Sequence, residues 1–197
     1  MEKIGFYGGC FNPPTRAHIQ LAIKVLQNYK LDKIFFVPVG NAYNKKELAD
    51  EQHRYNMLKI AIQNEPNLEI LDIELNQNKN FKAIDVFKLI NNKFKNSQNY
   101  FIMGADNFQK IENWKDYQTL ISEFNYIVLS RENIGINKNK NKNVHYFKKC
   151  QIDCSSTQVR EYIKQSNIQS LQEYIDNNVL NYIMNNQLYL YKKEEYI

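Results

Sequence analysis

The chain has 197 residues, which is enough for one domain, or for one domain with a small helical appendage. Hydrophobic residues make up 43% of it and aromatic residues 13%, so it can bury a core and is not a disordered tail. Its 26 Lys and Arg against 21 Asp and Glu leave a net charge of +5, which suits phosphorylated metabolites as well as nucleic acid.

Cysteine usage and the amino terminus indicate a protein of the reducing cytoplasm. The three cysteines are an odd number, and the chain begins with a charged residue and a short apolar strand, not a signal-peptide core. No apolar run approaches the roughly 20 residues that span a bilayer, so we expect no membrane association. Cys150 and Cys154 have no second pair of ligands nearby in the sequence, and we predict no zinc site.

Strand and helix patterns alternate in chain order. We predict strands at 3–7, 33–39, 68–73, 100–103 and 126–129, and helices at 15–29, 50–62, 83–94, 156–164 and 176–185. The run Ile34-Phe35-Phe36-Val37 is typical of a strand covered on both faces, as in a parallel sheet. The expected buried stripe of the first helix is Ile19, Ala22, Ile23 and Leu26.

This order predicts right-handed crossovers and a doubly wound, Rossmann-like parallel α/β sheet with a small helical portion at its carboxyl end. We expect one domain over residues 1–197, with the α/β core in 1–150 and the helical part in 151–197. The lysines between Lys138 and Lys149 alternate with asparagines, a pattern that predicts a solvated loop. In such sheets ligands bind beyond the carboxyl ends of the strands, so the residues after each strand are the candidates for function.

The first strand is followed by Gly8-Gly9-Cys10-Phe11-Asn12-Pro13-Pro14-Thr15-Arg16-Ala17-His18. Two glycines let the backbone approach a ligand closely, and two prolines stiffen the entry to the helix. Thr15 and His18 are three residues apart in the first helical turn, so their side chains share a face. The free amides of a helix start favour phosphate, to which a histidine can donate a hydrogen bond. A glycine turn with a surface histidine is the alternative for this segment alone.

The segment resembles the signature of the nucleotidyltransferase superfamily, Gly-Gly-Ser/Thr-Phe-Asp-Pro followed by His/Thr-x-Gly-His. Cys10, Asn12 and Ala17 replace the hydroxyl residue, the Asp and the Gly of the common form. Since the family uses the backbone near position 10, the thiol need not prevent binding, whereas the methyl group of Ala17 changes the fit around the triphosphate. The Asn-Pro and Thr-x-x-His forms look like the eukaryotic branch of the nicotinamide mononucleotide adenylyltransferases.

Three further segments resemble the same enzymes. Gly40-Asn41-Ala42-Tyr43-Asn44-Lys45-Lys46 is similar to the loop whose lysine reaches the ATP phosphates. Gly104-Ala105-Asp106 with Trp114 is similar to the segment whose Asp binds ribose hydroxyls and whose Trp stacks on the pyridine ring. Ser155-Ser156-Thr157-Gln158-Val159-Arg160 looks like the motif that grips the β and γ phosphates, with Ser155 as a helix N-cap. Taken one at a time, the first two segments are better explained by surface lysines and a core tryptophan, and the third is also compatible with a capped helix.

The resemblance covers essentially the whole chain and implies adenylyl transfer from ATP to nicotinate mononucleotide, with its amide as a second candidate substrate. It assigns catalysis to His18, Thr15, Lys45 and Arg160. It assigns ATP to Gly8, Gly9, Cys10, Phe11, His18, Gly104, Asp106, Ser155, Ser156, Thr157 and Arg160. It assigns the mononucleotide to Asn41, Tyr43, Lys45, Asp106, Trp114 and Arg131. Mg²⁺ is expected to bind through substrate phosphates, with no metal site built from side chains.

Other functions fit fewer of these residues. A phosphopantetheine adenylyltransferase shares the first motif but gives no reason for Gly104-Ala105-Asp106 with Trp114. A class I aminoacyl-tRNA synthetase fragment lacks support because no Lys-Met-Ser-Lys-Ser-like loop is present. A basic RNA-binding protein needs a clustered aromatic and basic face, whereas the aromatic residues here fall mainly in apolar strands and helices. We therefore expect no nucleic-acid partner, and the sequence leaves the oligomeric state open.

Overall fold

The computed structural model describes residues 1–43, 45–130, 142–148, 155–167 and 169–190. Six parallel strands form one sheet in the order β3-β2-β1-β4-β5-β6. The strands are β1 (Glu2–Gly9), β2 (Lys33–Pro38), β3 (Leu68–Ile70), β4 (Ser97–Gly104), β5 (Asn125–Ser130) and β6 (Val144–Lys148). The order reverses between β1 and β4, as in doubly wound nucleotide-binding sheets, which confirms the predicted fold class.

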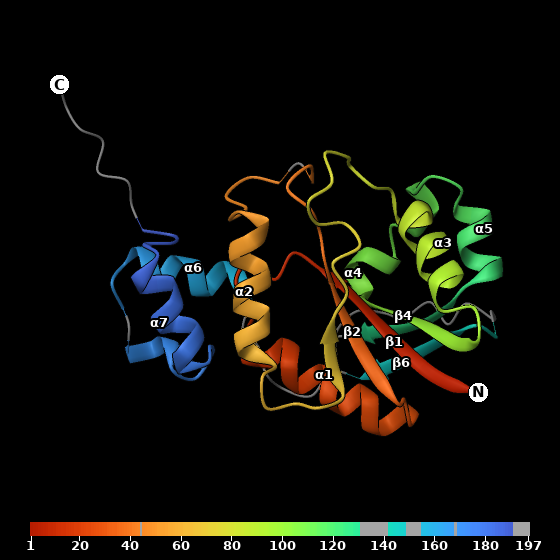
Figure 1. Cartoon of the computed structure of the whole chain (residues 1–197), viewed down its shortest axis with the longest axis horizontal. Helices are drawn as coiled ribbons and strands as arrows, with labels where there is room; N and C mark the ends of the chain where they lie inside the picture. The colour runs from red at the N-terminus through yellow and green to blue at the C-terminus, as the bar shows by residue number, and fades with distance from the viewer. Residues whose placement is uncertain (44, 131–141, 149–154, 168, 191–197) are drawn as a thin grey trace.

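Helices connect the strands, and further helices follow the last strand (Figure 1). They are α1 (Arg16–Tyr29), α2 (Glu51–Ala61), α3 (Ala83–Lys93), α4 (Ala105–Phe108), α5 (Tyr117–Glu123), α6 (Ser156–Lys164) and α7 (Asn177–Asn185), with single 3₁₀ turns at η1 (Ile111–Asn113) and η2 (Gln169–Leu171). Local chemistry sets several of the starts. The side chains of Asp50, Ser155 and Asp176 each accept a hydrogen bond from a backbone N–H in the first turn of α2, α6 and α7.

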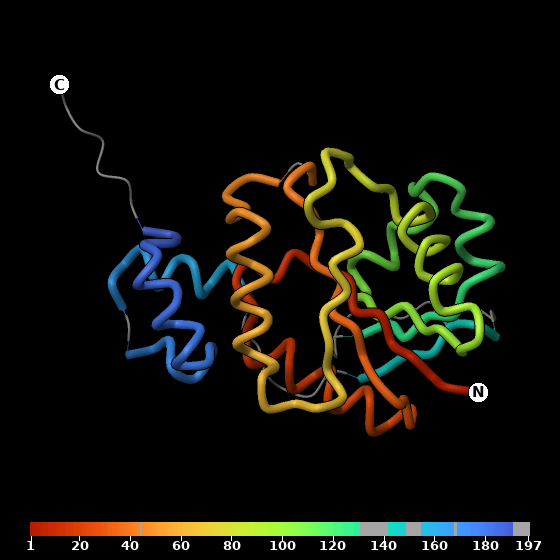
Figure 2. The backbone as a smooth tube through the Cα atoms, viewed as in Figure 1, coloured from red at the N-terminus to blue at the C-terminus, as the bar shows by residue number. Residues whose placement is uncertain are grey.

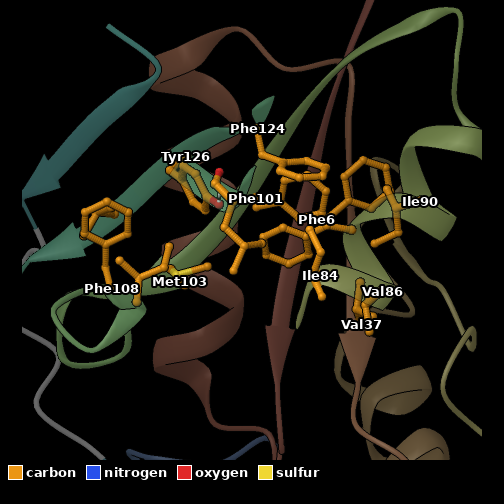
Figure 3. Close-up of a cluster of buried hydrophobic side chains, with 14 of the residues drawn as sticks. Phe6, Val37, Ile84, Val86, Ile90, Phe101, Met103, Phe108, Phe124 and Tyr126 are labelled. Carbon is orange, nitrogen blue, oxygen red and sulfur yellow. Dashed lines mark hydrogen bonds between the residues drawn. The ribbon is translucent and has the colours of Figure 1, made fainter. Parts of the chain in front are cut away.

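Alternate side chains of the central strands enter two separate cores. Phe6, Phe35, Phe101 and Tyr126 point to one face, where they pack against α3, α4 and α5. Figure 3 shows part of this core, in which the Phe87 and Phe101 rings stack with centroids 3.6 Å apart. The intervening residues of the same strands, such as Ile34 and Ile102, face α1 and α2. Burial on both faces explains why these strands read as continuous apolar runs.

The carboxyl-terminal helices form a third apolar cluster beside α2. Val159 of α6, Leu171 of η2 and Val179 of α7 are fully buried together with Met57, which α2 contributes. Helices α6 and α7 (blue) lie at one end of the molecule, next to α2 and on the opposite side from α3 and α5 (Figures 1 and 2). Helix α2 therefore belongs to two cores at once, and it links the sheet to the helical portion.

Three predictions from the sequence are corrected by the structure. Residues 144–148 form strand β6, so a loop throughout the lysine-rich segment is wrong; Val144 and Phe147 pack on opposite faces of the sheet, a pattern masked by neighbouring lysines. Helix α1 fully buries Ala17, Leu21, Ala22 and Val25; of the predicted stripe, Ala22 is fully buried, whereas Ile19, Ile23 and Leu26 pack against the same core and stay partly exposed. Strand β3 ends at Ile70, three residues early, and α4 and α5 were not predicted because they are short.

Candidate functional site

Three loops meet where β1, β2 and β4 end at the centre of the sheet. Gly8 and Gly9 of β1 lie opposite Val37 and Pro38 of β2, and Gly104 ends β4 on the other side of β1. The loops that follow are the ones that carry the sequence motifs. Because parallel strands end at one edge of the sheet, residues far apart in the chain are brought into one region.

The two glycines of the loop after β1 differ in the space around them: the backbone is open at Gly8, whereas a neighbouring ring fills the space beside Gly9. Gly8 is exposed, and a Cβ there would meet no atom within 4 Å, so its backbone is open to a ligand. A Cβ on Gly9 would lie 2.9 Å from the Phe11 ring, which therefore requires glycine at this position. Phe11 is buried with φ 46°, a left-handed conformation that is uncommon for a bulky residue, and the Asn12–Pro13 peptide bond is cis.

Helix α1 begins with the predicted pair of residues in contact. Nδ1 of His18 lies 3.0 Å from the backbone N of Thr15 and 2.7 Å from its hydroxyl oxygen. A backbone N–H can only donate, so Nδ1 accepts, and the neutral imidazole carries its proton on Nε2. The ring is held edge-on to Phe11, with centroids 5.4 Å apart. The pair thus fixes the histidine tautomer that can donate a hydrogen bond from Nε2.

Helix α6 touches the same loop with both residues predicted to share a face. The Ser156 hydroxyl donates to the carbonyl of Pro13 at 2.8 Å, and Nη1 of Arg160 donates to the carbonyl of Asn12 at 2.9 Å. Ser155 caps the helix as predicted, and Thr157 is exposed in the first turn. Within the described residues, Nε of Arg160 is buried without a hydrogen-bond partner. The first turns of α1 and α6 therefore meet across residues 12–15.

The loop after β2 separates the two lysines that the sequence left as alternatives. Nζ of Lys45 lies 3.7 Å from the sulfur of Cys10, which brings it to the loop after β1. Lys46 is exposed and shows no such contact in the described part of the chain. Tyr43 is also at the surface, with 43% of the residue exposed. Both Tyr43 and Lys45 are exposed residues beside the loop after β1.

Asn41 has a structural task in the same loop. Its side-chain amide donates to Asp50 at 2.7 Å and accepts from the backbone N of Glu51 at 2.8 Å, so it holds the start of α2. The Glu51 carboxylate in turn accepts from the backbone N atoms of Asn41 and Asn76, at 2.6 and 2.8 Å. The hydrogen bond from Asn41 is the main cause of the lowered pKa of Asp50. The predicted contact of Asn41 with the mononucleotide stays a prediction.

The segment after β4 is open by comparison. Gly104 has free space where a Cβ would be, and Asp106 is exposed in the first turn of α4. Asp106 makes no side-chain hydrogen bond or ion pair with any residue that the structure describes. Trp114 is half-buried, with its side chain against the core under α3 and α5 and the rest accessible. Arg131, Cys150 and Cys154 lie outside the described residues.

The sequence reading missed the buried polar residues beneath these loops. Arg54 of α2 is fully buried; its Nε donates to the carbonyl of Ala49 at 2.8 Å and its Nη1 to the carbonyl of Cys10 at 3.2 Å. Burial lowers its pKa, and Nη2 has no partner within the described residues. Burial also raises the pKa of the nearby Glu74 to about 7, although the charge of Arg54 opposes the shift. One signal in the sequence could have identified Arg54. It lies three and four residues before Met57 and Leu58, and so shares the apolar face of α2 with them.

The residues that the structure describes contain neither a metal site nor a membrane-spanning helix. Across the described ranges, no group of three or more His, Cys, Asp or Glu side chains could hold a metal ion. No helix in those same ranges is long and apolar enough to cross a membrane.

Comparisons with known proteins agree with this arrangement. The sequence model of the cytidylyltransferase-like family matches residues 6–162. A probable nicotinate-nucleotide adenylyltransferase from Clostridium novyi is 33% identical over 176 residues, which cover 83% of this chain and 88% of that protein. One from Acholeplasma laidlawii is 34% identical over 189 residues, covering 93% and 95%.

Solved structures support the fold independently. The nicotinic acid mononucleotide adenylyltransferase of Plasmodium falciparum complexed with NaAD superposes with a TM-score of 0.83, at 24% identity, over 96% of this chain and 98% of that one. At 24% identity this structural similarity shows the fold alone. The family is shown by the family model and the bacterial relatives. The chain therefore belongs to the cytidylyltransferase-like family and, within it, to the nicotinate-nucleotide adenylyltransferases.

Proposed function

We propose that the chain transfers the adenylyl group of ATP to nicotinate mononucleotide, releasing pyrophosphate and forming the deamido precursor of NAD. The observation that carries the proposal is the meeting of the α1 and α6 starts on one loop, through Ser156 with Pro13 and Arg160 with Asn12. Two helix starts at one place supply partial positive charge for a triphosphate. The names of the relatives agree with this substrate pair.

The chemistry needs alignment more than acid–base catalysis. A phosphate oxygen of the mononucleotide, already anionic at neutral pH, attacks the α-phosphorus of ATP, and the bond to the β-phosphate oxygen breaks. His18 would donate from Nε2 to the α-phosphate, with Thr15 holding the ring. Lys45 and Arg160 would neutralise the departing pyrophosphate. ATP would enter as its Mg²⁺ complex, since phosphate oxygens are the hard ligands that this ion prefers.

The mononucleotide would occupy the more open side of the site. Asp106 is exposed, and its carboxylate can accept two ribose hydroxyl protons. The half-buried ring of Trp114 would offer a face to the cationic pyridine, with Tyr43 near the other edge. Arg131 would contact an anionic group of the substrate.

The test compares two substrates under identical ATP and Mg²⁺ concentrations. We expect pyrophosphate release with nicotinate mononucleotide, and measurable release with the amide, because the loops at Asn12 and Asn41 look like those of dual-specificity enzymes. An amide presents an NH₂ group where a carboxylate-binding site has donors, and buried mispairing of that kind can discriminate by up to about 10⁴-fold. A preference for the acid beyond that range would contradict dual use. No release with either substrate would contradict the proposed function.

A further inference from the structure

Asn12 joins four parts of the chain at the loop after β1. Its amide nitrogen donates to the carbonyl of Glu47 at 2.8 Å, and its Oδ1 accepts from the backbone N of Ala49 at 3.0 Å. The same Oδ1 accepts from the hydroxyl of Tyr189 at 2.8 Å, and the Asn12 carbonyl accepts from Arg160. The side chain needs both a donor and an acceptor here, which an asparagine supplies and a carboxylate does not.

Tyr189 reaches this loop from the far end of the described chain. The two hydrogen-bonded residues are 177 positions apart in sequence. Tyr189 has φ 64°, a left-handed conformation that is a genuine outlier for a bulky residue and that surrounding contacts must hold in place. Burial raises the pKa of its hydroxyl, and the nearby charges of Arg160 and Arg54 act in the opposite direction. The hydroxyl therefore stays protonated, as a donor to Asn12 must be.

We propose that Tyr189 is a positioning residue for adenylyl transfer, which acts through Asn12 to hold the loop between β1 and α1 in its reactive geometry. The idea rests on the proposed function, because the loop is taken to bind the triphosphate. Tyr189 contacts no substrate in this account. Its hydroxyl fixes Asn12, and Asn12 fixes the backbone that leads to Thr15 and His18.

The chain supplies a matched control in Tyr182. That tyrosine belongs to α7, and its hydroxyl bonds with His53 and Asn56 of α2, at 2.9 and 3.0 Å, so it joins the helical portion to the core without touching Asn12. Tyr189→Phe and Tyr182→Phe each remove one hydroxyl and keep the ring. A general loosening of the helical portion would affect both variants, whereas loss of loop positioning would affect the first alone.

The experiment measures kcat, KM and hydrogen exchange for both variants. For Tyr189→Phe we expect kcat to fall about tenfold with little change in KM for the mononucleotide, since small misplacements of reacting groups are costly. Peptides containing residues 8–15 should exchange faster in Tyr189→Phe and remain unchanged in Tyr182→Phe. Equal effects of the two variants, or unchanged exchange in residues 8–15, would overturn the proposal.

A double-mutant cycle tests whether the effect passes through Asn12. In an Asn12→Ala background, Tyr189→Phe should lower kcat no further, whereas two independent sites would give additive losses. Additive losses would remove Asn12 from the path. If Asn12→Ala does not fold, the Tyr182 comparison still decides. Wild-type inactivity in the same assay would count against the proposed function, while exchange in residues 8–15 would still report on the positioning role.

Discussion

The two sides of the site differ in how much of their structure exists before any substrate arrives. On the side of β1, α2 and α6, the loop carbonyls of Cys10, Asn12 and Pro13 each accept a hydrogen bond from a side chain of another element. On the side of β4, Asp106 is exposed and has no such bond within the described residues. A site that transfers phosphoryl groups benefits from rigid donors, because reorganisation during the reaction raises the barrier. Under the proposed function, the rigid side would align the triphosphate and the open side would recognise the mononucleotide.

The largest effect should come from His18, at the centre of the rigid side. His18→Ala should lower kcat by about 10²–10³-fold, since one preorganised donor to developing charge is worth that much. His53→Ala is the control. It also removes a histidine from a helix, but the side chain of His53 bonds with Tyr182 and lies away from the loop. Near-normal kcat in a folded His18→Ala protein would remove this residue from the mechanism.

The partly buried Glu74, near Arg54, should have a measurable effect on stability. The pKa of Glu74 is raised from 4.5 to about 7, so ionising this carboxyl costs more free energy in the folded chain than in the unfolded one. The unfolding free energy is therefore highest below about pH 4.5, where Glu74 is protonated, and falls as the pH rises through 7. Glu74→Gln imitates the protonated form. It should therefore gain on the order of 3 kcal/mol in unfolding free energy relative to wild type between pH 5 and pH 8. Denaturant unfolding at both pH values measures the gain, with the exposed Glu112→Gln as the control. A difference in unfolding free energy between Glu74→Gln and wild type that is the same at pH 5 and pH 8 would contradict this interpretation.

On the open side of the site, we expect a substitution to weaken use of the substrate and to leave the stability of the fold unchanged. Asp106→Asn should lower kcat/KM for the mononucleotide by about 10- to 100-fold, the value of hydrogen bonds to a charged group. Its melting temperature should match that of wild type, since Asp106 supports no described part of the fold. Asp116→Asn changes an exposed carboxylate ten residues away and should have little effect on either. A lower melting temperature for Asp106→Asn would show that this side is also built in advance.

The smallest expected effect separates the two lysines. Lys45→Ala should raise KM for ATP about fivefold, because a flexible, exposed ammonium group contributes less than a fixed donor. The effect on KM for the mononucleotide should be smaller, and Lys46→Ala should change neither. Equal effects of the two variants would mean that the contact of Lys45 with Cys10 does not mark the phosphate side.

The same division explains what the sequence could predict. The glycines, Thr15, His18 and Ser155 were identifiable because turns, caps and helix starts are encoded within a few neighbouring residues. Arg54 was missed because its function depends on carbonyls that only the folded chain brings near. Strand β6 was missed because lysines and asparagines around it outweigh five residues of strand pattern. For Asn12, the substitution was visible in the motif, whereas its bond to Tyr189 was not.

The distance in sequence between Asn12 and Tyr189 also matters while the protein is being made. All of β1, β2 and β4 have left the ribosome by the time residue 104 is free, and they can pair as soon as their covering helices follow. Arg160 and Tyr189, which contact the first loop, come 56 and 85 residues after residue 104. At about 5–20 residues per second, synthesis of those 85 residues takes roughly 4 to 17 seconds. During that interval a nascent chain can pair its central strands while the loop after β1 still lacks its contacts with Arg160 and Tyr189. If this loop binds ATP as proposed, we expect ATP binding only after Tyr189 has been made.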